Sequence, residues 1–145
     1  MRLNTKMRYG TRAMLELACH YPEGLRSLAE IAASQEVSPK YMESVFRLLR
    51  SAGLVHAQRG GQGGYRLSRP PEAINLRDLY EILEGPEPYV ACTEDAQICP
   101  RSAECVTQEV WARMYAAAVG VLAGTTLADL VRRGQERHEQ PAYSI

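Results

Sequence analysis

Three cysteines lie close together in the second half of the chain, at positions 92, 99 and 105. Six and five residues separate them, whereas structural zinc sites usually present paired thiols about two to four residues apart. The wider spacing predicts a loose loop that can enclose something larger than one ion. Cysteine thiolates hold iron–sulfur clusters, often with nitrogen or oxygen ligands beside them. We therefore expect Cys92, Cys99 and Cys105 to bind a cluster, with incidental thiols or a disulfide pair as the alternative.

The length of the chain and the composition of its first residues indicate its domain number and its cellular compartment. The chain has 145 residues, enough for one domain or for a small domain with a dimerisation arm. The first residues lack the apolar run of a signal peptide, and no stretch approaches the roughly 18 apolar residues of a membrane span. We expect a cytoplasmic protein without a membrane partner. In a reducing cytosol, metal or redox chemistry is favoured over structural disulfides.

Charge divides the chain into two unlike halves. Residues 1–69 carry 11 Lys and Arg against 5 Asp and Glu, whereas residues 70–145 carry 6 against 12. The basic half is the candidate for binding a polyanion. No Ser/His/Asp set and no paired carboxylates in a shared motif indicate an enzyme.

The basic half has the pattern of a helix-turn-helix. Apolar residues recur at helical spacing over residues 7–20, and a second helix is expected from residue 28. Ser27 and Glu30 form a capping box for that helix. Ser38 caps a third helix with Pro39 at its first position, where the missing N–H costs nothing. Two short capped helices joined by about four residues are typical of the helix-turn-helix.

A β-hairpin is expected directly after the third helix. Residues 54–59 alternate like a strand, residues 65–67 return, and residues 60–64 contain four glycines. A phosphate-binding loop would need a Gly-Lys-Ser/Thr ending before a helix, so nucleotide binding is rejected. A hairpin after a recognition helix is a wing. Arg59 at its base and Arg66 on its return strand suit phosphates or a minor groove.

The acidic half is expected to provide a dimer interface. A short amphipathic helix is expected around residues 76–83 and a long one from about 104 to 123. A winged domain alone has too little surface to cover the long helix and the short helix that follows it, so a second copy is the favoured partner. The expected interface residues are Trp111, Met114, Ala118 and Val121.

These elements predict a mostly α fold with a small β-hairpin wing, namely a winged helix-turn-helix plus a long dimerisation helix. The expected organisation is a DNA-binding domain at 1–85, a cysteine loop at 86–105, a dimerisation helix with a short terminal helix at 106–134, and a flexible tail at 135–145.

With this order of elements, the chain resembles the IscR-like family of winged-helix transcription regulators over nearly its whole length. The matching features are Met1-Arg2-Leu3 with Lys6, Arg8 and Tyr9; residues 28–32; Tyr41-Met42-Glu43 with Phe46 and Leu49; residues 53–55; Arg59-Gly60 with residues 63–65; the three cysteines; and residues 105–107 before Trp111. The resemblance implies a homodimer whose cysteines hold an iron–sulfur cluster, 2Fe–2S in preference to 4Fe–4S.

The sequence departs from that family at the fourth cluster ligand. Gln108 stands where IscR has a histidine, and Arg8 stands where NsrR-like members have an acidic residue that serves the partner subunit's cluster. An amide is a weak ligand by softness and basicity. Gln108, Glu104, Glu109 and a small molecule remain candidates.

The expected function is a transcription regulator that reads a roughly palindromic double-stranded DNA site and senses iron–sulfur status, iron or redox stress. The helix from Ser38 to Ser51 should enter the major groove. The expected DNA contacts are Arg2, Ser38, Lys40, Tyr41, Glu43, Ser44, Arg59 and Arg66. Two alternatives remain: a thiol-switch regulator without a cluster, and an iron–sulfur scaffold protein.

Overall fold

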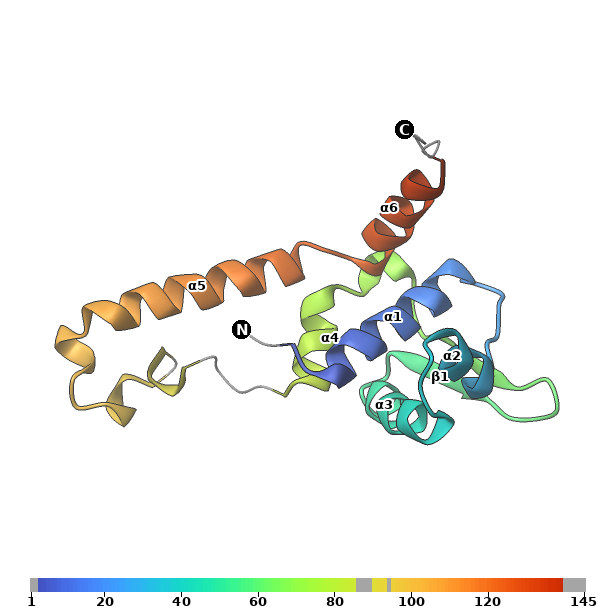
Figure 1. Ribbon diagram of the computed structural model, residues 1–145, viewed down its shortest axis with the longest axis horizontal. Helices are drawn as coiled ribbons and strands as arrows, with labels where there is room; N and C mark the ends of the chain where they lie inside the picture. Colours follow the sequence, from blue (N-terminus) through green and yellow to red (C-terminus); the bar gives the residue numbers. More distant parts are fainter. Residues whose placement is uncertain (1–2, 86–89, 94, 140–145) are drawn as a thin grey trace.

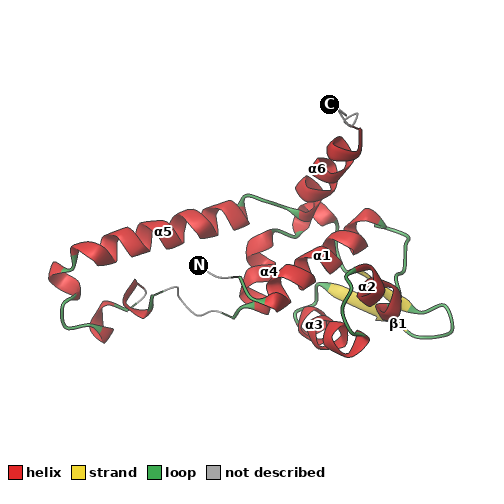
Figure 2. Cartoon of the chain, in the orientation of Figure 1, coloured by secondary structure: helices red, strands yellow, loops and turns green. Residues whose placement is uncertain are grey.

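The computed structural model describes residues 3–85, 90–93 and 95–139. The winged body contains α1 (Thr5–Cys19), α2 (Leu28–Ser34), α3 (Pro39–Ser51), strands β1 (Val55–Gln58) and β2 (Gly64–Leu67), and α4 (Leu76–Leu83). A long helix α5 (Val106–Ala123) extends from one side of this body, and α6 (Leu127–Glu139) returns to it (Figure 1). The predicted fold class, mostly helical with one small hairpin, is confirmed (Figure 2).

Local capping chemistry explains where the helices begin. Ser27 and Glu30 form the expected capping box of α2, and the Ser38 hydroxyl accepts a hydrogen bond from the Tyr41 N–H at the start of α3. Helix α1 begins slightly earlier than expected because the Asn4 side chain accepts from the Met7 N–H at 2.8 Å. Side-chain caps satisfy backbone donors that a helix start would otherwise leave unpaired.

The core lies between α1, α3, α4 and the hairpin. Phe46 and Leu49 of α3 are fully buried, as are Met14 of α1 and Leu79 of α4. The Phe46 ring meets the Tyr65 ring edge to face, with centroids 4.6 Å apart, so α3 and the wing are packed directly together. In the sequence Cys19 stands beside Ala18 in the first expected helix, which predicts a buried thiol. That prediction is wrong, because Cys19 is the last residue of α1 and is exposed there.

The wing is fastened to the segment before α2. The Arg26 N–H donates to the Tyr65 carbonyl at 3.0 Å, and the Tyr65 N–H donates to the Arg26 carbonyl at 2.8 Å. A Cβ atom at Gly64 would lie 2.6 Å from the Arg26 carbonyl oxygen, so a glycine is required for this approach. The hairpin therefore moves with the start of the helix-turn-helix.

Helix α6 is tied to α4 by backbone hydrogen bonds. The Leu76 N–H donates to the Thr125 carbonyl and the Leu127 N–H donates to the Ile74 carbonyl, both at 2.9 Å, and Leu127 is fully buried. Hydrogen bonds from Thr126, and then the Arg132 guanidinium, lower the pKa of Asp129 to about 2. Helix α6 continues past the expected end at residue 134 to Glu139, so residues 135–139 are helical; the rest of the expected tail lies outside the described residues. Among the described helices none is long and apolar enough to span a membrane.

Helices α3 and α4 both pack closely against α1 at Gly10. A Cβ atom there would lie 2.5 Å from Leu83 Cδ1 of α4 and 3.2 Å from Val45 Cγ1 of α3. Overpacking of a core costs about 1–3 kcal/mol. We expect Gly10→Ala to lower the free energy of unfolding by about this amount relative to Gly134→Ala on α6, where a Cβ meets nothing within 4 Å. Chemical denaturation of both variants measures the difference, and equal stabilities would contradict this packing.

Candidate nucleic-acid interface and cysteine site

Two of the eight expected DNA contacts, Lys40 and Glu43, lie on the exposed side of α3. Lys40, Glu43, Arg47 and Arg50 are exposed and separated by three, four and three residues. That spacing places them on one face of a helix. The opposite face is buried, because Met42, Val45, Phe46 and Leu49 fill the core. The helix therefore presents a row of charged side chains to the solvent.

Two residues expected to touch DNA have other roles in this structure. Tyr41 is half-buried, with its ring edge to face against Tyr9 at 6.0 Å, and its buried hydroxyl has no hydrogen-bond partner in the part of the chain described. Burial raises the pKa of Tyr41. The Ser44 hydroxyl donates to the Tyr41 carbonyl at 2.6 Å. Tyr41 thus packs α3 against α1, and its contact with DNA stays a prediction.

The wing presents its two expected arginines to solvent. Arg59 is exposed next to Gly60 at the turn, and Arg66 is exposed on β2 opposite His56. Arg2 lies outside the described residues. Sequence reasoning did not select Arg47 and Arg50, which line a hollow of about 400 Å³ with Glu43, Ser51 and Tyr65. Their helical spacing from Lys40 and Glu43 was the signal that would have found them.

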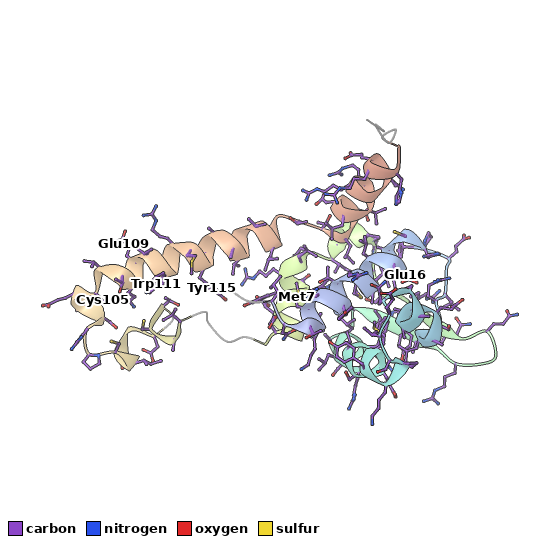
Figure 3. All side chains as sticks on the ribbon, viewed as in Figure 1. Met7, Glu16, Cys105, Glu109, Trp111 and Tyr115 are labelled. Atoms are coloured by element: carbon purple, nitrogen blue, oxygen red, sulfur yellow. The ribbon has the colours of Figure 1, made fainter. Side chains whose placement is uncertain are left out.

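The three cysteines occupy a strap that leads to the outer end of α5. Cys92 lies in a single helical turn (Ala91–Thr93), Cys99 follows a second (Ala96–Ile98), and Cys105 follows a third (Ser102–Glu104) and caps α5. These turns pack on one another in sequence, and the first also packs on α5. Figure 3 shows Cys105 at the far end of α5, well away from Met7 and Glu16 in the winged body. All three thiols are half-buried and none forms a disulfide.

Cys105 has the most distinctive thiol environment. Its sulfur lies 3.2 Å from the Thr107 hydroxyl oxygen. That hydroxyl, followed by the Gln108 backbone N–H, lowers the pKa of the Cys105 thiol. A lowered pKa favours the thiolate, which is both the metal ligand and the nucleophile. A hollow of about 520 Å³ adjoins this sulfur, lined by Pro100, Arg101, Ala103, Glu104, Cys105, Val106 and Thr107.

Gln108 and Ser102 hold unusual positions in the strap. The Gln108 amide nitrogen donates to the Cys92 carbonyl, which ties the first cysteine turn to α5. The Ser102 N–H donates to the Cys99 carbonyl at 3.1 Å, and the Cys105 N–H donates to the Ser102 carbonyl at 3.4 Å. Between these two cysteines the Ser102 hydroxyl is buried without a hydrogen-bond partner in the described residues. Gln108 therefore has a structural role that sequence reasoning did not foresee.

The donor set suits a group larger than a single ion. Within residues 3–85, 90–93 and 95–139, no three Cys, His, Asp or Glu side chains come together to ligate one metal ion. The strap nevertheless offers three thiols and an unpaired buried hydroxyl that could donate to sulfur. These residues fit an iron–sulfur group by the chemistry of their donors, and they equally suit thiol oxidation.

Helix α5 is exposed to an unusual degree for an apolar helix. None of its residues is fully buried. Among the predicted interface residues, Trp111 and Met114 are each 40% exposed and Val121 is 69% exposed, while Ala118 is half-buried. Val106 and Val110, which sequence reasoning did not select, are 80% and 54% exposed. Together Val106, Val110, Trp111, Met114, Ala118 and Val121 form what we call the α5 apolar face.

Comparisons with known proteins match almost the whole chain to one family. Residues 3–133 match the Rrf2 family, described as iron-dependent transcriptional regulators. The chain is 41% identical to Protein rrf2 of Nitratidesulfovibrio vulgaris over 132 residues, covering 91% of this chain and 88% of that protein. It is 41% identical to the HTH-type transcriptional regulator CymR of Bacillus subtilis over 143 residues, covering 99% and 97%.

A solved structure of T. potens IscR is similar in fold as well as in sequence. It superposes with a TM-score of 0.80 at 36% identity, over 99% of this chain and 95% of that one. The matching family and the CymR relative of this chain are named as transcriptional regulators rather than enzymes. The winged helix-turn-helix, the basic face of α3 and these matches lead to one conclusion: the chain belongs to the Rrf2 family of DNA-binding transcriptional regulators.

Proposed function

We propose that the protein is a homodimeric cytoplasmic regulator that senses iron–sulfur status, iron or redox stress through a cluster held by Cys92, Cys99 and Cys105. It would control genes of iron–sulfur cluster biogenesis or related functions. The observation that carries this proposal is the folded cysteine strap on the outer end of α5. Three thiols there adjoin a helix whose apolar face is uncovered. The family description as iron-dependent supports the choice of signal.

DNA reading is assigned to α3 and the wing. Recognition helices read base edges with their first turns, where Ser38, Lys40 and Glu43 are exposed. A carboxylate can accept from cytosine, so Glu43 is the proposed specificity residue, while Lys40 suits a phosphate. Arg59 enters the minor groove, and Arg47 and Arg50 add positive charge on the same face of α3.

Dimerisation is assigned to the α5 apolar face. An apolar stripe of this size on one helix is destabilising in water unless another surface covers it. A two-fold partner would bring the same face of its own α5 against this one, as isologous interfaces require. Two recognition helices related by two-fold symmetry read a roughly palindromic operator.

The cysteine strap is connected to the DNA-reading elements through the end of α4. Leu83 of α4 occupies the space beside Gly10 of α1, next to Val45 of α3. The Glu84 carboxylate accepts a hydrogen bond from the Asn4 N–H at 2.5 Å. The chain leaves this junction at Gly85, with a φ of 95°, toward the cysteines. We propose that a change in the strap reaches α4 along α5, which packs on both the first cysteine turn and α4. This connection can bias DNA affinity if the two states of the strap favour different dimer arrangements.

A bound iron–sulfur cluster supplies redox and ligand-exchange chemistry that responds to oxygen, nitric oxide and iron supply. The chain contributes three thiolates, with Cys105 favoured as thiolate by Thr107. The Gln108 amide nitrogen positions Cys92 by donating to the Cys92 backbone carbonyl. Only the amide oxygen of Gln108 is then free to bind iron, and it is a weak ligand. A cluster with a weak fourth ligand is lost readily. The presence or absence of the cluster, rather than only its oxidation state, is therefore the proposed signal that sets DNA affinity. A 2Fe–2S cluster is preferred over 4Fe–4S.

A second candidate is a thiol-switch regulator without a cluster. A solved relative with 39% identity and a TM-score of 0.79 is described as the global cysteine regulator CymR of B. subtilis. The lowered pKa of Cys105 and the adjoining hollow are compatible with reversible oxidation of that thiol. An iron–sulfur scaffold is disfavoured, because it would not need the DNA-binding module.

The DNA contact of the wing is tested by Arg59→Ala. We expect it to weaken operator binding by about 1–3 kcal/mol, the range for a good groove contact. The matched control is Arg133→Ala, which removes the same charge from an exposed position on α6. Fluorescence anisotropy at fixed salt measures both variants. Equal affinities for Arg59→Ala and the wild type would remove Arg59 from the interface.

The dimer interface is tested by Ala118→Glu. The added carboxylate would be buried without a partner between two copies of α5, so we expect monomers or a much weaker dimer. Ala116→Glu is the control, because Ala116 shares the opposite, exposed face of α5 with Glu109 and Arg113. Sedimentation at micromolar concentration distinguishes the outcomes. A monomeric wild type would contradict the proposal.

The cluster is tested by changing each cysteine of the strap to alanine. We expect each single variant to lose visible absorption and bound iron and sulfide while staying folded and dimeric. Cys19→Ala is the control, because this exposed thiol lies on α1 and should leave the spectrum unchanged. Anaerobically purified protein is required. A wild type that lacks iron and sulfide but remains fully regulated would establish the thiol-switch candidate instead.

A further inference from the structure

The carboxylate of Glu16 is a junction of side chains from separate elements of the winged body. Its Oε1 atom accepts from Arg26, with Nη2 at 3.1 Å and Nε at 3.3 Å. Its Oε2 atom accepts from the Ser34 hydroxyl and from the Gln35 amide at 3.2 Å. Both oxygens are therefore used, and the side chain is only 13% exposed. Figure 3 places Glu16 on α1, within the winged body.

Each partner of Glu16 belongs to a different part of the DNA-binding unit. Arg26 is the residue whose backbone pairs with Tyr65 of the wing. Ser34 is the last residue of α2, and Gln35 is its C-cap at the turn that leads into α3. One carboxylate on α1 thus connects the root of the wing with the turn of the helix-turn-helix.

Hydrogen bonds to a shared carboxylate impose a geometry that apolar packing alone does not. The Arg26 side chain is 28% exposed, so the ion pair lies partly out of water and its bonds are directional. Apolar contact would hold α1 against α2 but would allow small rotations of the turn. Such a rotation moves Ser38 and Lys40, which follow the turn directly, whereas loss of the Glu16–Arg26 ion pair loosens the segment whose backbone is bonded to the wing.

We infer that Glu16 is a positioning residue for DNA binding, which aligns the wing and the turn before α3 so that both contact one duplex. The inference rests on DNA binding by the winged body and does not require the cluster. Glu16 acts through Arg26, Ser34 and Gln35 and need not touch DNA itself.

The direction of the change in DNA affinity distinguishes a positioning role of Glu16 from a simple effect of its negative charge. Removing a negative charge from a DNA-binding protein should leave DNA affinity unchanged or strengthen it slightly, because phosphate attraction increases. Loss of alignment has the opposite effect. We expect Glu16→Gln to weaken binding by about tenfold, as for one lost groove contact. The matched control is Glu23→Gln, an exposed acid in the loop after α1, which should bind as tightly as the wild type or slightly tighter.

The experiment uses full-length protein and a duplex selected from a random library by the wild type. Kd is measured at several salt concentrations, at a temperature where circular dichroism shows every variant fully folded. Loss of a wing contact to phosphate should also reduce the slope of log K against log salt by about one unit. A change in stability alone would move neither quantity in fully folded protein.

Gln35→Ala serves as a second variant if Glu16→Gln does not fold, because it removes one bond to Glu16 without changing charge. It should weaken binding in the same direction by a smaller factor. Wild-type affinity and salt slope in the folded variants would overturn the inference. Failure of the wild type to select any duplex would instead overturn the proposed DNA-binding function.

Discussion

The burial of one side of α3 is the constraint on which the other surfaces of the winged body depend. Met42, Val45, Phe46 and Leu49 fill the core between α1, α4 and the hairpin. Because a helix turns once every 3.6 residues, burying these positions forces Lys40, Glu43, Arg47 and Arg50 outward together. The same burial places Phe46 on Tyr65, so the wing cannot shift without disturbing the core. The charged face that we propose reads DNA is therefore a consequence of hydrophobic packing.

Helix α5 shows what happens when such packing is missing within one chain. It is the longest helix described, yet it has no buried residue, and its contacts are to α4 and to the first cysteine turn. The exposed part of its apolar face gains nothing from the hydrophobic effect until another surface covers it. The winged body therefore has its own buried core within one chain, whereas α5 does not.

Polar contacts play a different role from the apolar core. The Glu16 junction, the Asn4–Glu84 hydrogen bond and the Gln108–Cys92 hydrogen bond each join elements that are distant in sequence. Each contributes modestly to stability, because folding exchanges bonds to water for bonds within the protein. Their directionality sets angles between elements that the apolar core already holds together. The angle between wing and recognition helix matters for reading DNA, and the position of Cys92 matters for the thiol site.

The local elements could be predicted from the amino-acid sequence alone: the capped helices around Ser27 and Ser38, the hairpin with its glycine turn, and the three cysteines in a loop before the long helix. These follow from capping chemistry and periodicity, which act over a few residues. The contacts of Tyr41, Gln108 and Glu16 could not be predicted from the sequence, because each depends on a partner outside its own helical turn. Tyr41, predicted to contact DNA, also packs edge to face on Tyr9. Cys19 looked buried by pattern, but its place at the last turn of α1 leaves it exposed. Periodicity shows which side of a helix is apolar, but what covers that side depends on long-range packing.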